Sequence, residues 1–220
     1  MQNIIGIDLS IKCPAVTVLT SDNKLKHFIF PRIGEHKTSF IDSLKLADVT
    51  VVEIPNIKLI KDSTLRERQN SSDANYLTYT ICNTIAPYIA DNPIFVIEGL
   101  SFKSGGDIGI TYGGYHYILR QTIHQYFNVS FDNMFIYAPL SVKSIVRKLY
   151  PIQDFKGSYK KEQMIDAFIN FEDDILQTST FRNSLEDIPE IYQKKTGTWQ
   201  KIDDIIDSYW VLKTHMEKQN

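Results

Sequence analysis

Three segments far apart in the sequence each place an acid beside an apolar run of the kind that becomes buried. They are Asp8 in NIIGIDLS, Glu98 in IFVIEGL, and the trio Asp203, Asp204 and Asp207 in KIDDIIDSYWVL. A carboxylate next to such a run carries a large desolvation cost unless its charge is paired or bound to a metal. A fold that unites the three segments gathers their acids into one pocket for divalent cations. The pattern therefore indicates a metal-dependent nuclease.

Composition favours a single soluble domain. The 220 residues suffice for one well-filled core and fall short of what two domains usually need. No apolar run approaches the length that crosses a bilayer, and the first residues read as a strand rather than a signal peptide. We therefore expect a cytoplasmic protein with no membrane partner, in the host cytoplasm if the source is viral or phage. Cys13 and Cys82 are expected to be free thiols.

Positive charge is concentrated in one part of the chain, although the net charge is −2. Between residues 143 and 161 the only acid is Asp154, and the bases are Lys143, Arg147, Lys148, Lys156, Lys160 and Lys161. Local charge decides whether a protein attracts nucleic acid more than the net charge does. The stretch is equally consistent with a DNA-binding surface and with solvated helix faces.

The first thirty residues predict three consecutive strands. Residues 3–9, 15–20 and 25–30 are apolar and rich in β-branched side chains, and a turn-like Ser-Asp-Asn separates the last two. Short strands in direct succession predict an antiparallel meander. Gly6 lies inside the first strand, where the missing side chain lets another backbone approach closely.

The remaining pattern alternates helices and strands, which predicts an α/β fold with a mixed central sheet flanked by helices. Residues 56–75 are polar and are expected to form a mobile arm, with Ser72 or Asp73 capping the helix that follows. Residues 171–200 are expected to be irregular. The other predicted elements are helices at 39–46, up to 86, 115–126, 139–149, 159–168 and 201–218, and strands at 51–54, 94–97 and 134–137.

The acids suit two-metal phosphodiester chemistry. Such a site holds two Mg²⁺ ions about 3.5–4 Å apart, one activating water and the other stabilising the leaving oxygen. Hard cations of this kind take oxygen ligands. In the last helix, both Asp203 and Asp204 share a face with Asp207. Asp203 is also placed to cap that helix, so Asp204 is favoured as the ligand.

Several motifs resemble those of RuvC-type Holliday-junction resolvases, and of viral or phage versions more than cellular ones. The matching segments are GIDLSIKCPAVTVL, VIEGLSFKSGG, PLSVKSIVRKLY, SYKKEQMIDAF and DDIIDSYWVL. The resemblance covers most of the core and leaves out two presumed insertions, residues 33–75 and 171–200. It implies an RNase H-like fold, a homodimer, and paired nicking of four-way DNA junctions with Mg²⁺ or Mn²⁺.

Carried over motif by motif, the resemblance implies roles for individual residues. Asp8, Glu98, Asp204 and Asp207 are the implied metal ligands and catalytic acids. Lys161 is implied in catalysis and DNA binding, and Lys143 and Phe102 in DNA binding. The helix bearing Tyr115, Tyr117, Ile118 and Ile123 is the expected dimer interface, unless it lies fully in the core. Tyr209 and Trp210 depart from the family, which has small residues after the last acid.

Other functions remain open at this point. Taken singly, Asp8 is as well explained by a bond to a turn, Glu98 by a buried lysine, and each lysine by a solvated face. An RNase H-like nuclease acting on flaps, other branched DNA or packaged DNA shares the acid set. An actin-like or sugar-kinase-like ATPase fragment is disfavoured, because such proteins need a second phosphate loop. A non-catalytic DNA-binding relative is disfavoured by the complete acid set.

Overall fold

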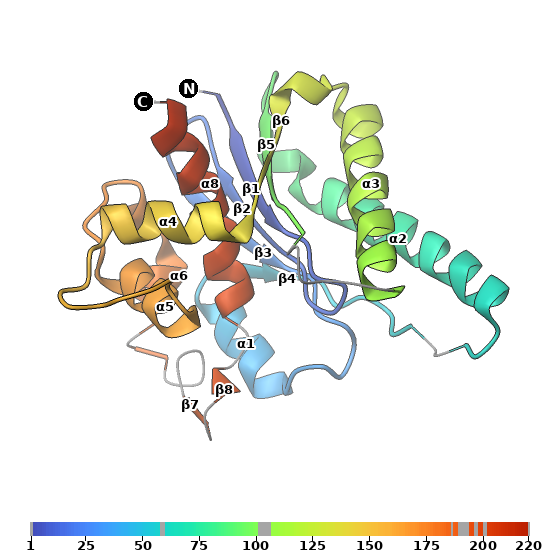
Figure 1. The fold of residues 1–220 in the computed structure, drawn as a ribbon, viewed down its shortest axis with the longest axis horizontal. Helices are drawn as coiled ribbons and strands as arrows, with labels where there is room; N and C mark the ends of the chain where they lie inside the picture. Colours follow the sequence, from blue (N-terminus) through green and yellow to red (C-terminus); the bar gives the residue numbers. More distant parts are fainter. Residues whose placement is uncertain are drawn as a thin grey trace.

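A six-stranded mixed sheet lies between two layers of helices (Figure 1). The computed structural model describes residues 2–57, 60–100, 107–185, 187–188, 194–195, 198–199 and 202–219. The sheet order is β4-β3-β2-β1-β5-β6. Its strands are β1 (Ile4–Asp8), β2 (Ala15–Leu19), β3 (Leu25–Ile29), β4 (Val49–Val51), β5 (Ile94–Glu98) and β6 (Met134–Tyr137).

The strand directions confirm the predicted fold class. β1, β2 and β3 form the expected antiparallel meander. β5 joins the other side of β1 in parallel, and β6 joins β5 in parallel. A three-stranded meander extended by parallel strands beside its first strand is the α/β, RNase H-like arrangement. β4 adds a further strand parallel to β3 at the opposite edge.

The helices divide between the two faces of the sheet. They are α1 (Thr38–Leu46), α2 (Ser63–Ile85), α3 (Asp107–Phe127), α4 (Pro139–Leu149), α5 (Lys161–Asn170), α6 (Thr180–Asn183) and α8 (Asp203–Gln219). One hydrophobic cluster packs α2 and α3 against one face. The other cluster packs α1, α4, α5, α6 and α8 against the opposite face. A two-stranded hairpin, β7 (Lys194–Lys195) with β8 (Thr198–Trp199), lies outside the sheet.

Alternation along the strands decides which face receives the acids. In β1, Ile5 and Ile7 pack into the cluster with α2 and α3, whereas Ile4 packs on the α8 side. Successive side chains of a strand point to opposite faces, so Gly6 and Asp8 share the α8 side with Ile4. β5 follows the same rule: Val96 belongs to the α8 cluster, and Glu98 lies two residues on.

Gly6 allows α8 to lie directly on β1, which confirms the predicted close approach of another backbone at this glycine. A Cβ atom at Gly6 would overlap the Ser208 carbonyl oxygen and would lie 2.8 Å from the Leu212 Cβ. Real side chains do not tolerate such distances, so only glycine fits this contact. The large Tyr209 and Trp210 are both fully buried on α8, packed among aromatic side chains such as Phe168 and Phe171.

The expected mobile arm at residues 56–75 is wrong from residue 63 onward. α2 begins at Ser63, and the Asp62 side chain caps it by accepting a hydrogen bond from the Leu65 backbone N–H (2.9 Å). Asp73 is therefore no cap. It lies within α2, where its carboxylate pairs with the buried Arg32 at 2.5 Å and accepts a bond from the Tyr115 hydroxyl at 2.6 Å. These contacts anchor α2 to the sheet edge and to α3.

Other boundaries differ from the prediction for local reasons. β4 ends at Val51, and Ile54 retains only an isolated bridge to Arg32. α3 begins at Asp107, so the glycines at 113–114 lie inside a helix. Residues 171–185 are less irregular than expected, because a 3₁₀ turn at Leu176–Thr178 and α6 bury Leu176 and Phe181 in the core.

Two further expectations concern side chains on α3 and the cysteines. Tyr115 and Ile123 are buried in the core, so they cannot serve a dimer interface as proposed from sequence, whereas Tyr117 is 58% exposed. Cys13 and Cys82 are buried and are not joined by a disulfide, as expected. Across the described residues, no helix combines the length and apolar character that crossing a membrane requires.

Candidate active site

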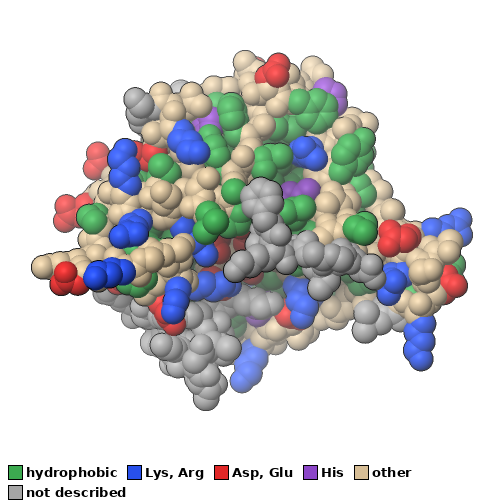
Figure 2. Space-filling model, in the orientation of Figure 1, with side chains coloured by type: hydrophobic (Ala, Val, Ile, Leu, Met, Phe, Trp, Pro, Cys, Tyr) green, Lys and Arg blue, Asp and Glu red, His purple; other side chains and the backbone are tan. Residues whose placement is uncertain are grey.

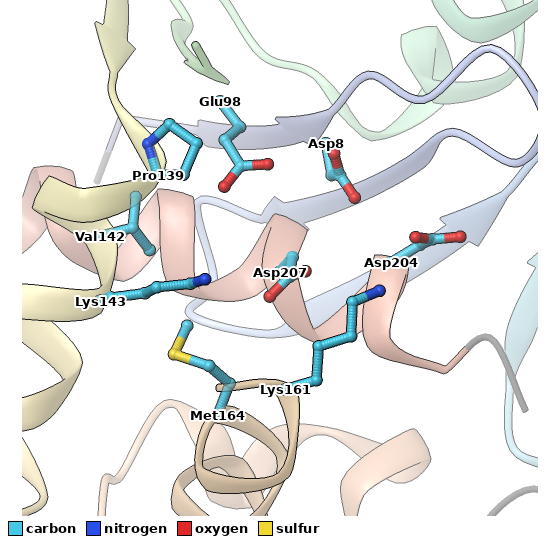
Figure 3. Close-up of a pocket in the computed structure, with 9 residues that line it drawn as sticks. All are labelled: Asp8, Glu98, Pro139, Val142, Lys143, Lys161, Met164, Asp204 and Asp207. Atoms are coloured by element: carbon cyan, nitrogen blue, oxygen red, sulfur yellow. The ribbon is translucent and has the colours of Figure 1, made fainter. Parts of the chain in front are cut away.

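A pocket of about 270 Å³ opens where the carboxyl ends of β1 and β5 meet α8. Helices α4 and α5 close its other side (Figure 3). The residues lining it are Asp8, Glu98, Pro139, Val142, Lys143, Lys161, Met164, Asp204 and Asp207. Four acids and two lysines from five separate elements thus share one cavity.

Strand pairing places Asp8 beside Glu98. β1 and β5 are parallel with Ile7 opposite Ile97, so the next residue of each strand emerges at the same edge. Both strands are apolar and buried up to this point, which fixes them in the centre of the sheet. The two carboxylates point from the sheet toward α8 (Figure 3).

The first turns of α8 supply the other two carboxylates. Asp204 and Asp207 are three residues apart and therefore lie on one helix face, and both line the pocket. Asp203 behaves differently. It is the first residue of α8 and is only 5% exposed. It does not line the pocket, but it forms an ion pair with Lys161, which does. Asp204 therefore lies on the pocket wall, whereas Asp203 does not.

Burial makes negative charge unfavourable on Asp8, Glu98 and Asp207, and repulsion by other acids adds to this at Asp8 and Asp207. Burial, followed by the charges of Glu98, Asp204 and Asp207, raises the pKa of Asp8 well above its usual value. Burial raises the pKa of Asp207 in the same way, with the charges of Glu98, Asp203 and Asp204 adding to it. Burial also raises the pKa of Glu98, although a hydrogen bond with Asp8 and the charges of Lys143 and Lys161 oppose the rise. Such strongly perturbed acids in a cleft are typical of functional sites.

The two lysines face the acids from the opposite wall (Figure 3). Lys161 opens α5, where the Gln163 side chain accepts a hydrogen bond from the Lys160 backbone N–H (3.0 Å) and fixes the first turn. This bond gives Gln163 of the SYKKEQMIDAF segment a structural role. Burial alone would lower the pKa of Lys161, but the bond to Asp203 and the charges of Asp203, Asp207 and Asp204 raise it overall. Lys161 therefore stays charged.

The donor chemistry of the pocket fits divalent metal ions. Four carboxylates offer the oxygen ligands that Mg²⁺ and Mn²⁺ prefer. Within the described part of the chain, no three His, Cys, Asp or Glu side chains are gathered closely enough to enclose an ion. The carboxylates line the walls of an open pocket instead. Repulsion among like charges favours this spread arrangement, and a cation between them lowers the repulsion.

Most residues singled out in the sequence meet at this site. The structure brings together Asp8, Glu98, Asp204, Asp207, Lys143 and Lys161. Phe102 lies outside the described residues. Sequence reasoning did not identify Pro139, Val142 and Met164 as apolar walls of the pocket. Pro139 and Val142 belong to the same PLSVK motif as Lys143, so their place beside it was a usable signal.

Comparisons with known proteins find similarity among solved structures. Two are of RuvC from Thermus thermophilus, one of them in complex with a Holliday junction substrate. Each aligns with a TM-score of 0.49 and 10% identity, over 99% of this chain and 96% or 97% of the other. A third is the fowlpox virus resolvase with Holliday junction DNA, with a TM-score of 0.43, 17% identity and 99% of both chains covered.

No family model matches the chain, and no curated protein matches it.

Proposed function

We propose that the chain is a structure-specific DNA endonuclease of the RuvC type, which resolves four-way junctions by metal-dependent phosphodiester hydrolysis. One observation carries the proposal: four acids and two lysines from distant parts of the sequence line a single pocket on an RNase H-like sheet. Carboxylates that only stabilised the fold would not need to lie close enough together to repel one another. The resemblance of five sequence segments to the resolvase motifs supports the same assignment.

The acids are the proposed metal ligands. Asp8, Glu98, Asp204 and Asp207 would hold two Mg²⁺ or Mn²⁺ ions, which supply an activated water and stabilise the leaving oxygen when bound. The sheet and α8 are rigid supports, and a site on rigid elements positions its reactants well. The carboxylates also orient the attacking water relative to the phosphate by accepting hydrogen bonds from it.

The lysines are the proposed partners of the phosphate. Lys161 is held near the acids through Asp203, and its charge is well placed to stabilise the negative charge that develops on the phosphoryl oxygens. Lys143 reaches the pocket from α4 and adds a second positive charge for the strand that enters. Together they offset the repulsion between the acids and the DNA backbone.

A homodimer completes the proposal. One chain contributes one acid set, and cutting two opposed strands of a junction requires two sets related by a two-fold axis. Branched DNA is the proposed partner, with the two pockets facing symmetrical strands.

Substrate choice tests this function directly. Purified protein is incubated with end-labelled four-way junction, linear duplex, flap and RNA–DNA hybrid in Mg²⁺ or Mn²⁺, with an EDTA control for each. The proposal expects cleavage of the junction at paired, symmetrical positions and no cleavage with EDTA. Preferential cutting of the flap or the hybrid would assign the same pocket to an RNase H-like nuclease of other specificity. No metal-dependent cutting of any substrate would refute a nuclease.

A further inference from the structure

A second cavity lies beside α4 and shares Lys143 with the pocket that the four acids line, here called the acid pocket. Its volume is about 280 Å³. The residues lining it are Leu140, Lys143, Ser144, Arg147, Gly157, Ser158 and Tyr159, which come from α4 and from the loop between α4 and α5. We call it the basic cavity. Apart from Lys143, none of these residues has a role in the proposed catalytic chemistry.

Lys143 belongs to both cavities. It lines the acid pocket beside Glu98 and also lines the basic cavity beside Arg147. Arg147 follows Lys143 by four residues, so the two side chains lie on the same face of α4. A polyanion that enters the acid pocket past Lys143 therefore meets Arg147 next.

Arg147 is held in position by backbone groups. Its guanidinium donates to the carbonyl of Gly157 (2.9 Å) and to the carbonyl of Phe155 (3.2 Å). These two bonds use two of the five N–H groups of an arginine, and the side chain remains exposed. A guanidinium fixed in this way loses little further freedom when it binds an anion.

The loop that forms the other wall is also fixed. The buried Tyr159 donates its hydroxyl hydrogen to the Tyr150 carbonyl (2.6 Å) and accepts a bond from the Ile152 backbone N–H (2.9 Å). Gly157 adopts a φ of +107°, a conformation that suits glycine and turns the chain back toward α4. The basic cavity is therefore built before any ligand arrives.

The lining chemistry favours a phosphodiester. It combines two cationic side chains with the hydroxyls of Ser144 and Ser158, and none of the described lining residues is acidic. Leu140, 68% exposed, lies at the same cavity and offers an apolar surface suited to a sugar ring rather than to a free anion. Figure 2 shows Lys and Arg side chains gathered over the side of the molecule that α4 and α5 form in Figure 1.

We propose that the basic cavity binds a phosphate of the cleaved DNA strand next to the scissile one, with Arg147 as its main ligand. The inference rests on the proposed function, because it places the scissile phosphate in the acid pocket. It adds a subsite that sets the direction and register of the strand.

Paired substitutions on α4 test the subsite. Arg147→Gln removes the fixed guanidinium, and Lys148→Gln removes the same charge from the next residue, which is exposed and does not line the basic cavity. Binding of a labelled junction is measured in Ca²⁺ over a series of salt concentrations. Arg147→Gln is expected to weaken binding about equally for all junction sequences and to lower the slope of log K against log salt by about one. The Lys148→Gln protein should change much less.

Neutral phosphates identify the contact. Methylphosphonate is introduced at one position at a time along the labelled strand, and each junction is bound to the wild type and to Arg147→Gln. The proposal expects one position, near the cut, where neutralising the phosphate weakens the wild type but adds nothing to the loss in Arg147→Gln.

The outcomes separate this inference from the proposed function. Equal losses in the two α4 variants, or additive losses at every phosphate, would overturn the subsite while leaving junction cutting intact. If one phosphate is coupled to Arg147 but the protein binds junctions without cutting them, the subsite is supported and the nuclease function is refuted. A wild type that binds no junction would overturn both.

Discussion

Burial opposes ionisation of Asp8, Glu98 and Asp207, and the charges of neighbouring acids add to this effect at Asp8 and Asp207. A bound cation is the simplest compensation, so their charge matters more than their shape. We expect Asp8→Asn, Glu98→Gln and Asp207→Asn each to lower the cleavage rate by more than about 100-fold, since even groups that merely support metal ligands are worth 10–100-fold. Junction affinity should stay within a few-fold, because the amide removes repulsion toward phosphate. Single-turnover cleavage and gel-shift binding measure the two effects.

Asp203 and Asp204 provide an internal comparison for these variants. Asp204 lines the pocket, whereas Asp203 holds Lys161 beside it. Asp204→Asn is expected to join the inactive group, and Asp203→Asn to keep metal-dependent cleavage at a reduced rate. A dead Asp203→Asn beside an active Asp204→Asn, both folded by circular dichroism, would reverse the ligand assignment.

At the scale of elements, the seating of α8 on β1 depends on one missing side chain. A methyl group at position 6 would collide with the Ser208 carbonyl and the Leu212 side chain. Gly6→Ala should therefore destabilise the fold by about 2 kcal/mol or more, as overpacking does, and should reduce cleavage by displacing Asp204 and Asp207. Urea unfolding measures the first effect.

Gly114→Ala is the matched control. Gly114 lies inside α3, and a Cβ there would meet no atom within 4 Å. Alanine in a helix interior is favoured over glycine by about 0.5–1 kcal/mol, so this variant should be slightly more stable. Equal effects of the two substitutions would argue against a close contact at Gly6.

His27 links several elements inside the core. Its Nδ1 bonds the Thr17 hydroxyl (2.9 Å), its Nε2 bonds the Ser179 hydroxyl (2.8 Å), and Thr17 in turn bonds Ser208 of α8 (2.7 Å). Burial, helped by the charge of Lys26 and opposed by that of Asp48, lowers the pKa of His27 to about 3. The chain of bonds therefore contains a neutral imidazole.

The shifted pKa of His27 predicts a pH dependence of stability. Between about pH 6.5 and pH 3 the unfolded chain binds a proton at His27 that the folded protein does not. The contribution of the neutral His27 to the free energy of unfolding is complete above pH 6.5 and falls by about 1.4 kcal/mol per pH unit below it. Urea unfolding at pH 7, 6 and 5 should show a steeper decline for the wild type than for His27→Gln. Parallel curves would contradict a neutral buried imidazole.

The sequence was most informative where burial is continuous. The strands at 4–8, 15–19, 25–29 and 94–98 could be located because both faces of the central sheet are covered, which requires apolar β-branched runs. The first half of α2 could not, because it is largely exposed and has no apolar periodicity before Ala74. Its capping by Asp62 was a local signal, but its anchoring through Arg32 and Asp73 is a tertiary contact.

The candidate site also has features that the sequence predicts and features that depend on tertiary packing. The acids could be located because each interrupts an apolar segment. The pairing of Lys161 with Asp203, and the basic cavity between α4 and the following loop, depend on how helices pack on the sheet. Neither leaves a periodic trace in the sequence.

At the scale of the whole molecule, α3 presents apolar side chains that the core does not use. Ile110 is 71% exposed and Tyr117 58% exposed, while Tyr115 and Ile123 are buried. We expect a homodimer in solution that is lost in the double variant Ile110→Glu, Tyr117→Glu. Light scattering at micromolar concentration, with and without a four-way junction, measures the mass.

Leu46→Glu serves as the dimer control. Leu46 is 77% exposed on α1, which packs on the opposite face of the sheet. It should leave the mass unchanged. A monomeric wild type, with and without DNA, would remove the paired-nick mechanism and favour a nuclease that cuts single strands.

The late position of α8 in the chain has a consequence during synthesis. A ribosome that has completed β5 has produced Asp8 and Glu98, but Asp204 and Asp207 follow only after about a hundred further residues. The face of β1 at Gly6 therefore stays uncovered until α8 has left the exit tunnel and packed onto β1. Nascent chains and products of premature termination before residue 204 carry half of the acid set. Under the proposed mechanism such fragments cannot cut the genome of the cell that makes them.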